Sequence, residues 1–159
     1  SELSKHLTLI KRDYAKDGFF LRAESLYNAA TYIDEVKATH NYGNVSLHNQ
    51  SHGESFLSIV QNRFSGNGLY LLDEPEAALS PMRLMTLLIE IDNLLKNNSQ
   101  FIIATHSPIL MAFPNAEILQ FSESGIKNVK YYDTEHYKTT KLFIEEPEKM
   151  IHHLIDSNN

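Results

Sequence analysis

Cysteine is absent from this sequence of 159 residues. A disulfide framework and a zinc site built on thiolates are therefore excluded, and the absence fits a reducing, cytoplasmic setting. Long apolar runs are absent as well. The runs GLYLL before Asp73 and FIIA before Thr105 are far shorter than the about 20 residues that cross a bilayer. We therefore expect no direct insertion into a membrane.

An excess of basic residues is also missing, since the formal net charge is -6. The chain as a whole has no electrostatic attraction to DNA or to anionic lipid, although a local basic patch leaves nucleic-acid binding open. Apolar residues make up 42% of the chain and charged residues 21%, which are ordinary globular values and exclude a disordered chain. A chain of this length is expected to form one domain, or a large piece of one.

Three short apolar segments have the length of buried strands. They are FFL (19–21), LYLL (69–72) and FIIA (101–104). LYLL is apolar at every position, which is typical of a parallel-sheet strand covered on both faces. Apolar residues at helical spacing predict helices that start near Leu3, at Ser25, at Ser51 and at Ser80. The β-loop-α-β order predicts an α/β fold with a parallel sheet core and flanking helices.

The C-terminal part has a different pattern. The segments AEILQF (116–121) and IKNVKYY (126–132), separated by a Ser-Gly turn, predict a hairpin. Asp133 is expected to cap a final helical region, which Pro147 divides. We therefore expect three parts, at about 1–66 (helical), about 67–115 (core) and about 116–159 (C-terminal hairpin and helices).

Chemically active side chains follow two of the predicted strands. Asp73 and Glu74 come directly after LYLL, and His106 follows FIIA. Because the carboxyl ends of parallel strands meet at one edge of a sheet, we expect these groups at a common ligand site. Asp73 is placed to hold a magnesium ion, usually through its water shell. Glu74 is placed to orient and partly deprotonate a water molecule, and His106 to bond a phosphate.

The helix start at Ser51 is a second candidate site. Ser51 and Glu54 form a capping-box pattern, which by itself is a structural feature. The free amides and the dipole at a helix start also suit the binding of phosphate. Both roles are compatible, because the cap fixes the helix end that a phosphate then meets.

Three motifs in order resemble the ABC ATPase superfamily: SHGES (51–55), YLLDEPEAALS (70–80) and ATHSP (104–108). The chain is still more similar to a group of small soluble bacterial AAA/ABC-like predicted ATPases. That second resemblance extends to GFFLRAESLYNAATYIDE and DTEHYKTTKLF and covers nearly all of the chain. It implies that residues 1–159 are the C-terminal portion of an ABC-type P-loop NTPase domain.

The resemblance also implies cofactors and roles. ATP and Mg²⁺ are the expected cofactors of a cytoplasmic ATPase that dimerises around nucleotide. Asp73 then corresponds to the Walker B aspartate, which in this family holds magnesium through water. Glu74 and His106 correspond to the catalytic base and the switch histidine.

In the same family the signature residues open a helix that faces the γ-phosphate held by the other subunit. Ser51 and Gly53 match the signature serine and second glycine, and Glu54 takes the glutamine position, as in the chromosome-maintenance and DNA-repair branch. His52 replaces the first glycine. Residues 77–80 resemble the D-loop that crosses the dimer interface, so the resemblance implies a homodimer.

The motif GxxxxGK[ST] is missing, and no Gly-Lys dipeptide occurs at all. This loop normally cradles the β- and γ-phosphates. We therefore expect the chain alone to be inactive. Two hypotheses stay open: the chain is the C-terminal portion of a complete ATPase, or it is a split or degenerate subunit that binds a complete ATPase partner and hydrolyses nothing itself.

Overall fold

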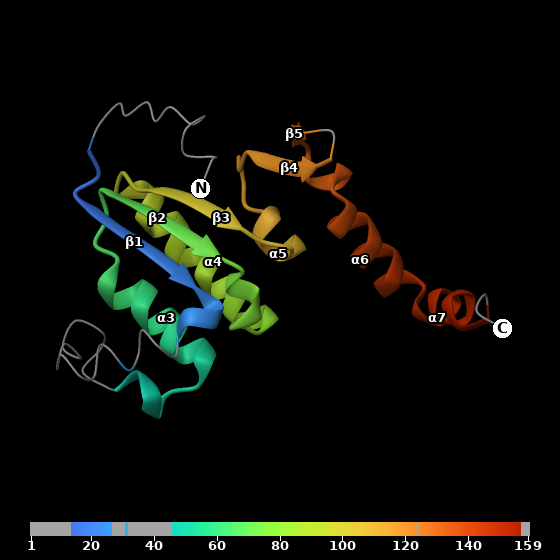
Figure 1. The fold of residues 1–159 in the computed structure, drawn as a ribbon, viewed down its shortest axis with the longest axis horizontal. Helices are drawn as coiled ribbons and strands as arrows, with labels where there is room; N and C mark the ends of the chain where they lie inside the picture. The colour runs from blue at the N-terminus through green and yellow to red at the C-terminus, as the bar shows by residue number, and fades with distance from the viewer. Residues whose placement is uncertain (1–13, 27–30, 32–45, 124, 157–159) are drawn as a thin grey trace.

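A computed structural model describes residues 14–26, 31, 46–123 and 125–156. Its centre is a three-stranded parallel sheet in the order β1 (Asp17–Arg22), β2 (Gly68–Asp73) and β3 (Gln100–Ala104) (Figure 1). The three predicted strands and the α/β class are confirmed. The helices predicted near Leu3 and beyond Leu26, and the loop 39–44, lie outside the described residues.

One face of the sheet is covered by α3 (His52–Arg63) and α4 (Pro81–Lys96) (Figure 1). Side chains from β1 and β2 that point to this face are almost fully buried, and they pack against the apolar stripes of the two helices. Each such side chain contributes about 2 kcal/mol by leaving water. The centre of this core consists of Leu21, Tyr70, Leu72, Phe56, Ile59, Val60, Leu84, Leu87 and Ile91.

The starts of both helices follow from local chemistry. Ser51 caps α3 by accepting a hydrogen bond from the Glu54 backbone, and the Glu54 side chain accepts one from the Ser51 backbone, which completes the predicted capping box. Ser80 caps α4 by accepting a hydrogen bond from the Arg83 backbone, and Pro81 occupies the first helical position, where no backbone donor is needed.

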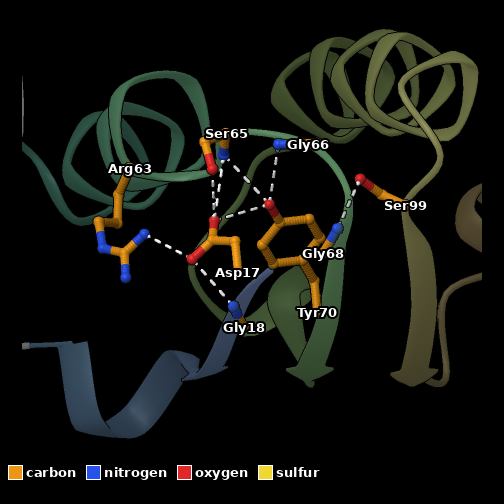
Figure 2. Close-up of polar contacts among 8 residues, drawn as sticks. All are labelled: Asp17, Gly18, Arg63, Ser65, Gly66, Gly68, Tyr70 and Ser99. Atoms are coloured by element: carbon orange, nitrogen blue, oxygen red, sulfur yellow. Dashed lines mark hydrogen bonds and ion pairs between the residues drawn. The ribbon is translucent and has the colours of Figure 1, made fainter. Parts of the chain in front are cut away.

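A polar network fixes the end of the sheet where β1 and β2 begin (Figure 2). The Asp17 carboxylate accepts hydrogen bonds from Arg63 at 2.8 Å, from the Tyr70 hydroxyl at 2.8 Å and from the backbone and hydroxyl of Ser65. Burial raises the pKa of Asp17, but these hydrogen bonds outweigh burial and hold that pKa well below its usual range. The Tyr70 ring also stacks on Phe64, with ring centroids 4.1 Å apart.

The opposite face of the sheet is open among the described residues. Phe20, Leu71 and Ile102 are in register across the three strands, and their side chains are 62%, 37% and 54% exposed. The prediction that LYLL is covered on both faces is therefore wrong for this part of the chain. The strand is apolar on both faces, but α3 and α4 both lie on one side of the sheet, and no described element covers the other.

The chain continues from β3 into the short helix α5 (Pro108–Met111) and then into an antiparallel hairpin, β4 (Ile118–Ser122) and β5 (Gly125–Val129). This confirms the predicted hairpin. Two helices follow, α6 (Glu135–Glu145) and α7 (Pro147–Asp156), and they extend away from the sheet (Figure 1). The predicted division at Pro147 is also confirmed.

The predicted cap at Asp133 is wrong by one residue. Asp133 ends a 3₁₀ turn, and Thr134 caps α6 by accepting a hydrogen bond from the Tyr137 backbone. The Thr134 hydroxyl also donates to the Tyr131 carbonyl, and Thr134 is only 3% exposed. A buried hydroxyl with both a donor and an acceptor partner is the more stable cap here.

Within the described part of the chain, each helix is too short or too polar for a membrane span.

Candidate functional site

The carboxyl edge of the sheet brings charged residues from two strands together. Arg22 ends β1, Asp73 ends β2, and the two residues are register partners. The Arg22 Nε donates a hydrogen bond of 2.6 Å to Asp73 Oδ2. This hydrogen bond, together with the charge of Asp73, raises the pKa of Arg22. Asp73 is 23% exposed at its side chain, so its carboxylate faces the edge of the sheet and remains accessible.

Glu74, the next residue, has a left-handed backbone conformation, which is unusual for glutamate. Its φ and ψ angles are 48° and 52°, in the left-handed region, and its backbone N–H donates to the Ala104 carbonyl at 2.9 Å. The other described residues with positive φ are three asparagines and two glycines, residue types that tolerate this region. A glutamate held there costs about 1–2 kcal/mol. Such local strain is characteristic of functional sites.

A small cavity opens beside these residues. It has a volume of about 80 Å³ and is lined by Arg22, Ala23, Glu24, Asp73 and Glu74. Since a water molecule occupies roughly 30 Å³ in the liquid, this space suits a few water molecules or a partly hydrated cation. It is too small for a nucleoside triphosphate. Other parts of a binding site must therefore be supplied by residues beyond this cavity.

His106 reaches the same edge from the end of β3. Its Nε2 lies 3.6 Å from Glu74 Oε1. The loop that carries His106 is fixed by Glu76, whose carboxylate accepts hydrogen bonds from the His106 backbone at 2.5 Å and from the Thr105 hydroxyl at 2.8 Å. The turns that follow β2 and β3 are thus joined by charge-assisted hydrogen bonds, which hold Glu74 and His106 in one arrangement.

A second histidine lies behind the first. His136, in the first turn of α6, places its Nε2 3.2 Å from His106 Nδ1. The two rings meet edge to face, with centroids 4.9 Å apart and an interplanar angle of 63°. The C-terminal helices are therefore connected to the polar residues at the sheet edge.

Ser51, Gly53 and Glu54 belong to a separate cluster at the start of α3. Arg83 of α4 donates to the Ser51 hydroxyl at 3.0 Å and pairs with Glu54 Oε1 at 3.0 Å. The Ser51 hydroxyl in turn donates to Glu54 Oε2 at 2.7 Å. Hydrogen bonds from the side chain and backbone of Ser51, and then the charge of Arg83, lower the pKa of Glu54. These groups hold one another in place.

Gly53 is buried where α3 meets the loop before α4. A Cβ at Gly53 would lie 2.6 Å from Arg83 Nη1, 2.9 Å from Arg83 Cδ and 3.0 Å from the Ala78 carbonyl oxygen. These distances are shorter than almost all real Cβ contacts. A side chain at position 53 would therefore have to displace Arg83 and press on the Ala78 carbonyl, so packing favours glycine here.

The structure brings together Asp73, Glu74 and His106 from the predicted site residues, and it places Ser51, Gly53 and Glu54 in the second cluster. Sequence reasoning missed three residues that hold these groups: Glu76, Arg83 and His136. Each is brought to its partner by the fold across about 30 residues of chain. Their spacing follows no local periodicity, so no signal in the sequence identifies them.

The residues at the sheet edge partly fit a magnesium ion. Magnesium is held by one or two carboxylates, with water and phosphate oxygens completing its shell. Asp73 supplies such a carboxylate beside a cavity of suitable size, and Oδ2 already binds a positive group, the Arg22 guanidinium. Among the described residues, no three acidic, histidine or cysteine side chains converge on a single metal position. An all-protein metal cage is therefore not present in this part of the chain.

Comparison with known proteins gives one match. Residues 39–112 match the family described as "AAA domain, putative AbiEii toxin, Type IV TA system". The matched stretch contains α3, β2, α4, β3 and α5, and it is less than half of the chain. No curated protein and no solved structure matches. The match supports an AAA-like P-loop NTPase and, with it, nucleotide binding in general, and it does not single out the ABC type.

Proposed function

We propose that this chain supplies the catalytic edge of an ATP-hydrolysing, ABC-type domain that dimerises around nucleotide. The observation that carries the proposal is the meeting of Asp73, Glu74 and His106 at the carboxyl edge of a parallel sheet, with Glu74 Oε1 3.6 Å from His106 Nε2. The AAA-like family match, which includes these residues, supports the nucleotide-binding part of this proposal.

In this mechanism Asp73, as the proposed Walker B aspartate, would hold Mg²⁺ through a water molecule. The ion would supply positive charge that neutralises the phosphate oxygens. Asp73 has to exchange its contact with Arg22 for this role, or to use its other oxygen. Arg22 is half exposed, so the exchange moves a surface side chain.

Glu74 acts as the general base. Its carboxylate orients a water molecule for in-line attack on the γ-phosphate and accepts a proton from it. The left-handed backbone and the bonds made by Glu76 fix where the Glu74 and His106 groups lie before nucleotide binds. His106 donates a hydrogen bond to the reacting phosphate. Such prior placement reduces the reorganisation needed in the transition state.

The start of α3 has a separate role in this proposal. Ser51, Gly53 and Glu54 face the nucleotide bound by the other subunit of a homodimer, and the amides of the helix start contact its γ-phosphate. The backbone at Gly53 packs against residue Ala78 of the loop that resembles a D-loop. A shift of that loop would therefore move the helix start, which links the two proposed halves of the composite site.

The decisive test of the base is Glu74→Gln in protein that carries a P-loop. Glutamine keeps the size and most contacts of the side chain but cannot accept the proton. Nucleotide binding should remain nearly intact, while hydrolysis slows by about 10² or more. Asp92→Asn, at an exposed residue of α4, is a matched charge control and should leave turnover unchanged. Weakened binding with unchanged turnover would contradict the assignment.

A second candidate function is a subunit that binds a complete ATPase partner and hydrolyses nothing itself. The absence of any Gly-Lys dipeptide from these 159 residues is compatible with this function and with the first one. The coding sequence upstream of Ser1 separates the two. A strand and P-loop in the same reading frame support the hydrolysing enzyme, and a start codon directly before Ser1 supports the separate subunit.

A further inference from the structure

We infer that His136 is a positioning residue that keeps His106 in one tautomer, the form with its proton on Nε2. This inference rests on the proposed role of His106 as a hydrogen-bond donor to the reacting phosphate. It gives a role to the first turn of α6, which lies outside the matched family region.

The argument begins with the two nitrogens of His106. The Nε2 faces a carboxylate oxygen of Glu74 at 3.6 Å, and the Nδ1 faces His136 Nε2 at 3.2 Å. A neutral imidazole carries a single proton, so one nitrogen donates and the other accepts. An Nε2 without a proton would point its lone pair at the negatively charged Glu74 carboxylate, and the two would repel each other. The favoured arrangement therefore places the proton on Nε2 and leaves Nδ1 as an acceptor.

The Nδ1 then needs a donor, and His136 Nε2 is the group that faces it. With its own proton on Nε2, His136 donates to His106 Nδ1 across 3.2 Å. The opposite tautomer of His106 would place two N–H groups against each other, unless His136 also changed. The hydrogen bond made by one ring nitrogen thus selects the proton position on the other.

His136 is itself held by a rigid support. Thr134, two residues earlier, is buried and caps α6, accepting from the Tyr137 backbone and donating to the Tyr131 carbonyl. The Tyr137 ring packs against Tyr131 with centroids 4.7 Å apart. These contacts fix the first turn of α6 and therefore the position from which His136 reaches His106.

This arrangement gives His106 the hydrogen-bonding polarity that the proposed mechanism requires. A proton on Nε2 is directed to the side where Glu74 lies and where a phosphate would be attacked. In the other tautomer Nε2 would be an acceptor and would repel phosphate oxygens. His136 touches no reacting group and acts through His106 alone.

Two substitutions separate positioning from packing. His136→Phe keeps a ring of similar shape and removes the donor, while His136→Gln keeps a donor near the Nε2 position. In protein that carries a P-loop, His136→Phe should lower kcat by about tenfold with little change in KM, the lower end of the effect seen when the hydrogen-bond partner of a metal-binding histidine is removed. His136→Gln should restore most of kcat. Equal kcat for the wild type and His136→Phe would overturn the inference.

The tautomer can be read directly in the 159-residue chain, without nucleotide or hydrolysis. Long-range ¹⁵N–¹H NMR correlations of the imidazoles report which nitrogen of His106 carries the proton. We expect Nε2–H in the wild type and in His136→Gln, and a mixture of tautomers in His136→Phe. A proton on Nδ1 in the wild type would overturn the inference. Circular dichroism of each variant checks the fold, so that loss of structure is not mistaken for loss of the donor.

The two readouts also distinguish this inference from the function on which it rests. If Glu74→Gln leaves hydrolysis unchanged while the NMR result is as expected, the proposed base fails and the His136 contact stands. If Glu74→Gln blocks hydrolysis but His106 carries its proton on Nδ1, the function stands and the positioning role fails. In the background His106→Ala, His136→Phe should have no further effect on kcat.

Discussion

Gly53 on α3 and Ala78 in the loop before α4 approach so closely that a Cβ at position 53 would lie 3.0 Å from the Ala78 carbonyl oxygen. The Arg83 side chain closes the same space from another direction. Because the Ala78 oxygen belongs to the backbone, it cannot turn away as a flexible side chain can. The glycine thereby sets the distance between the start of α3 and residues 77–80.

Gly53→Ala should therefore destabilise the fold. Inserting one methyl group into a packed position costs about 1–3 kcal/mol. Urea denaturation followed by circular dichroism measures the change in unfolding free energy. Gly18→Ala is the matched control, because a Cβ there would meet only the Leu69 carbonyl at an ordinary 3.5 Å. If the two variants have similar unfolding free energies, the start of α3 can shift to accommodate the added methyl group, and the prediction is wrong.

Asp17 should make the stability depend on pH in acid. Its pKa is lowered in the folded protein, so the unfolded chain takes up the proton first as pH falls. The stabilisation is fully present above the unfolded pKa, near pH 4, and is lost as pH decreases toward the lower folded pKa. Unfolding free energy measured from pH 6 down to pH 2 should decrease below about pH 4.

Asp17→Asn should reduce this dependence and cost about 2 kcal/mol at neutral pH, since it weakens hydrogen bonds to a partly buried charged group. Asp92→Asn is the control. Asp92 pairs with Lys96 on the surface of α4, with its side chain 50% exposed, and exposed pairs contribute about 1 kcal/mol at most. If the Asp17 variant keeps the full acid dependence, other carboxylates cause it.

Ser51→Ala distinguishes a helix cap from a nucleotide contact. Loss of the cap alone should cost about 1 kcal/mol of stability and leave the turnover of the folded protein unchanged. Under the proposed function, ATPase activity should decrease well beyond the loss of folded protein. Denaturation and steady-state turnover, measured on the same preparation, separate the two effects.

Mixing the Ser51 variant with a P-loop variant extends this test to the dimer. A mixed dimer contains one site built from two intact halves, so activity should return if Ser51 acts on the partner's nucleotide. Two inactive single variants whose mixture stays inactive, despite demonstrated subunit exchange, would remove the support for action across a dimer.

Local chemistry made much of this fold predictable. The apolar runs identify the strands, and Ser51 with Glu54 identifies the start of α3, because these signals depend on neighbours within one turn. The one-residue error at Asp133 has a tertiary cause, since burial of Thr134 decides which of two possible caps is used. The open sheet face was missed for a similar reason, because an apolar pattern does not say which element covers it.

The candidate site was predictable only in part. The end of a strand places Asp73 and Glu74 at the same edge as His106, so topology alone brings them together. The groups that hold them do not follow from topology. His136 is connected to His106 through the length of the hairpin and the turn before α6, and the contact depends on that whole path.

The left-handed backbone of Glu74 has a consequence for any attempt to improve this protein. Elsewhere among the described residues, left-handed positions are occupied by asparagine or glycine, the residue types that the conformation itself favours. The backbone conformation at position 74 favours glycine, whereas the proposed role of this residue needs a carboxylate. Replacement by glycine would relieve the strain but remove the carboxylate. A library screened only for survival at raised temperature would drift toward glycine or asparagine there, and under the proposed function its most stable members would lack the catalytic base. Thermostabilising design must therefore keep Glu74 as a deliberate choice, since conformational energy alone selects against it.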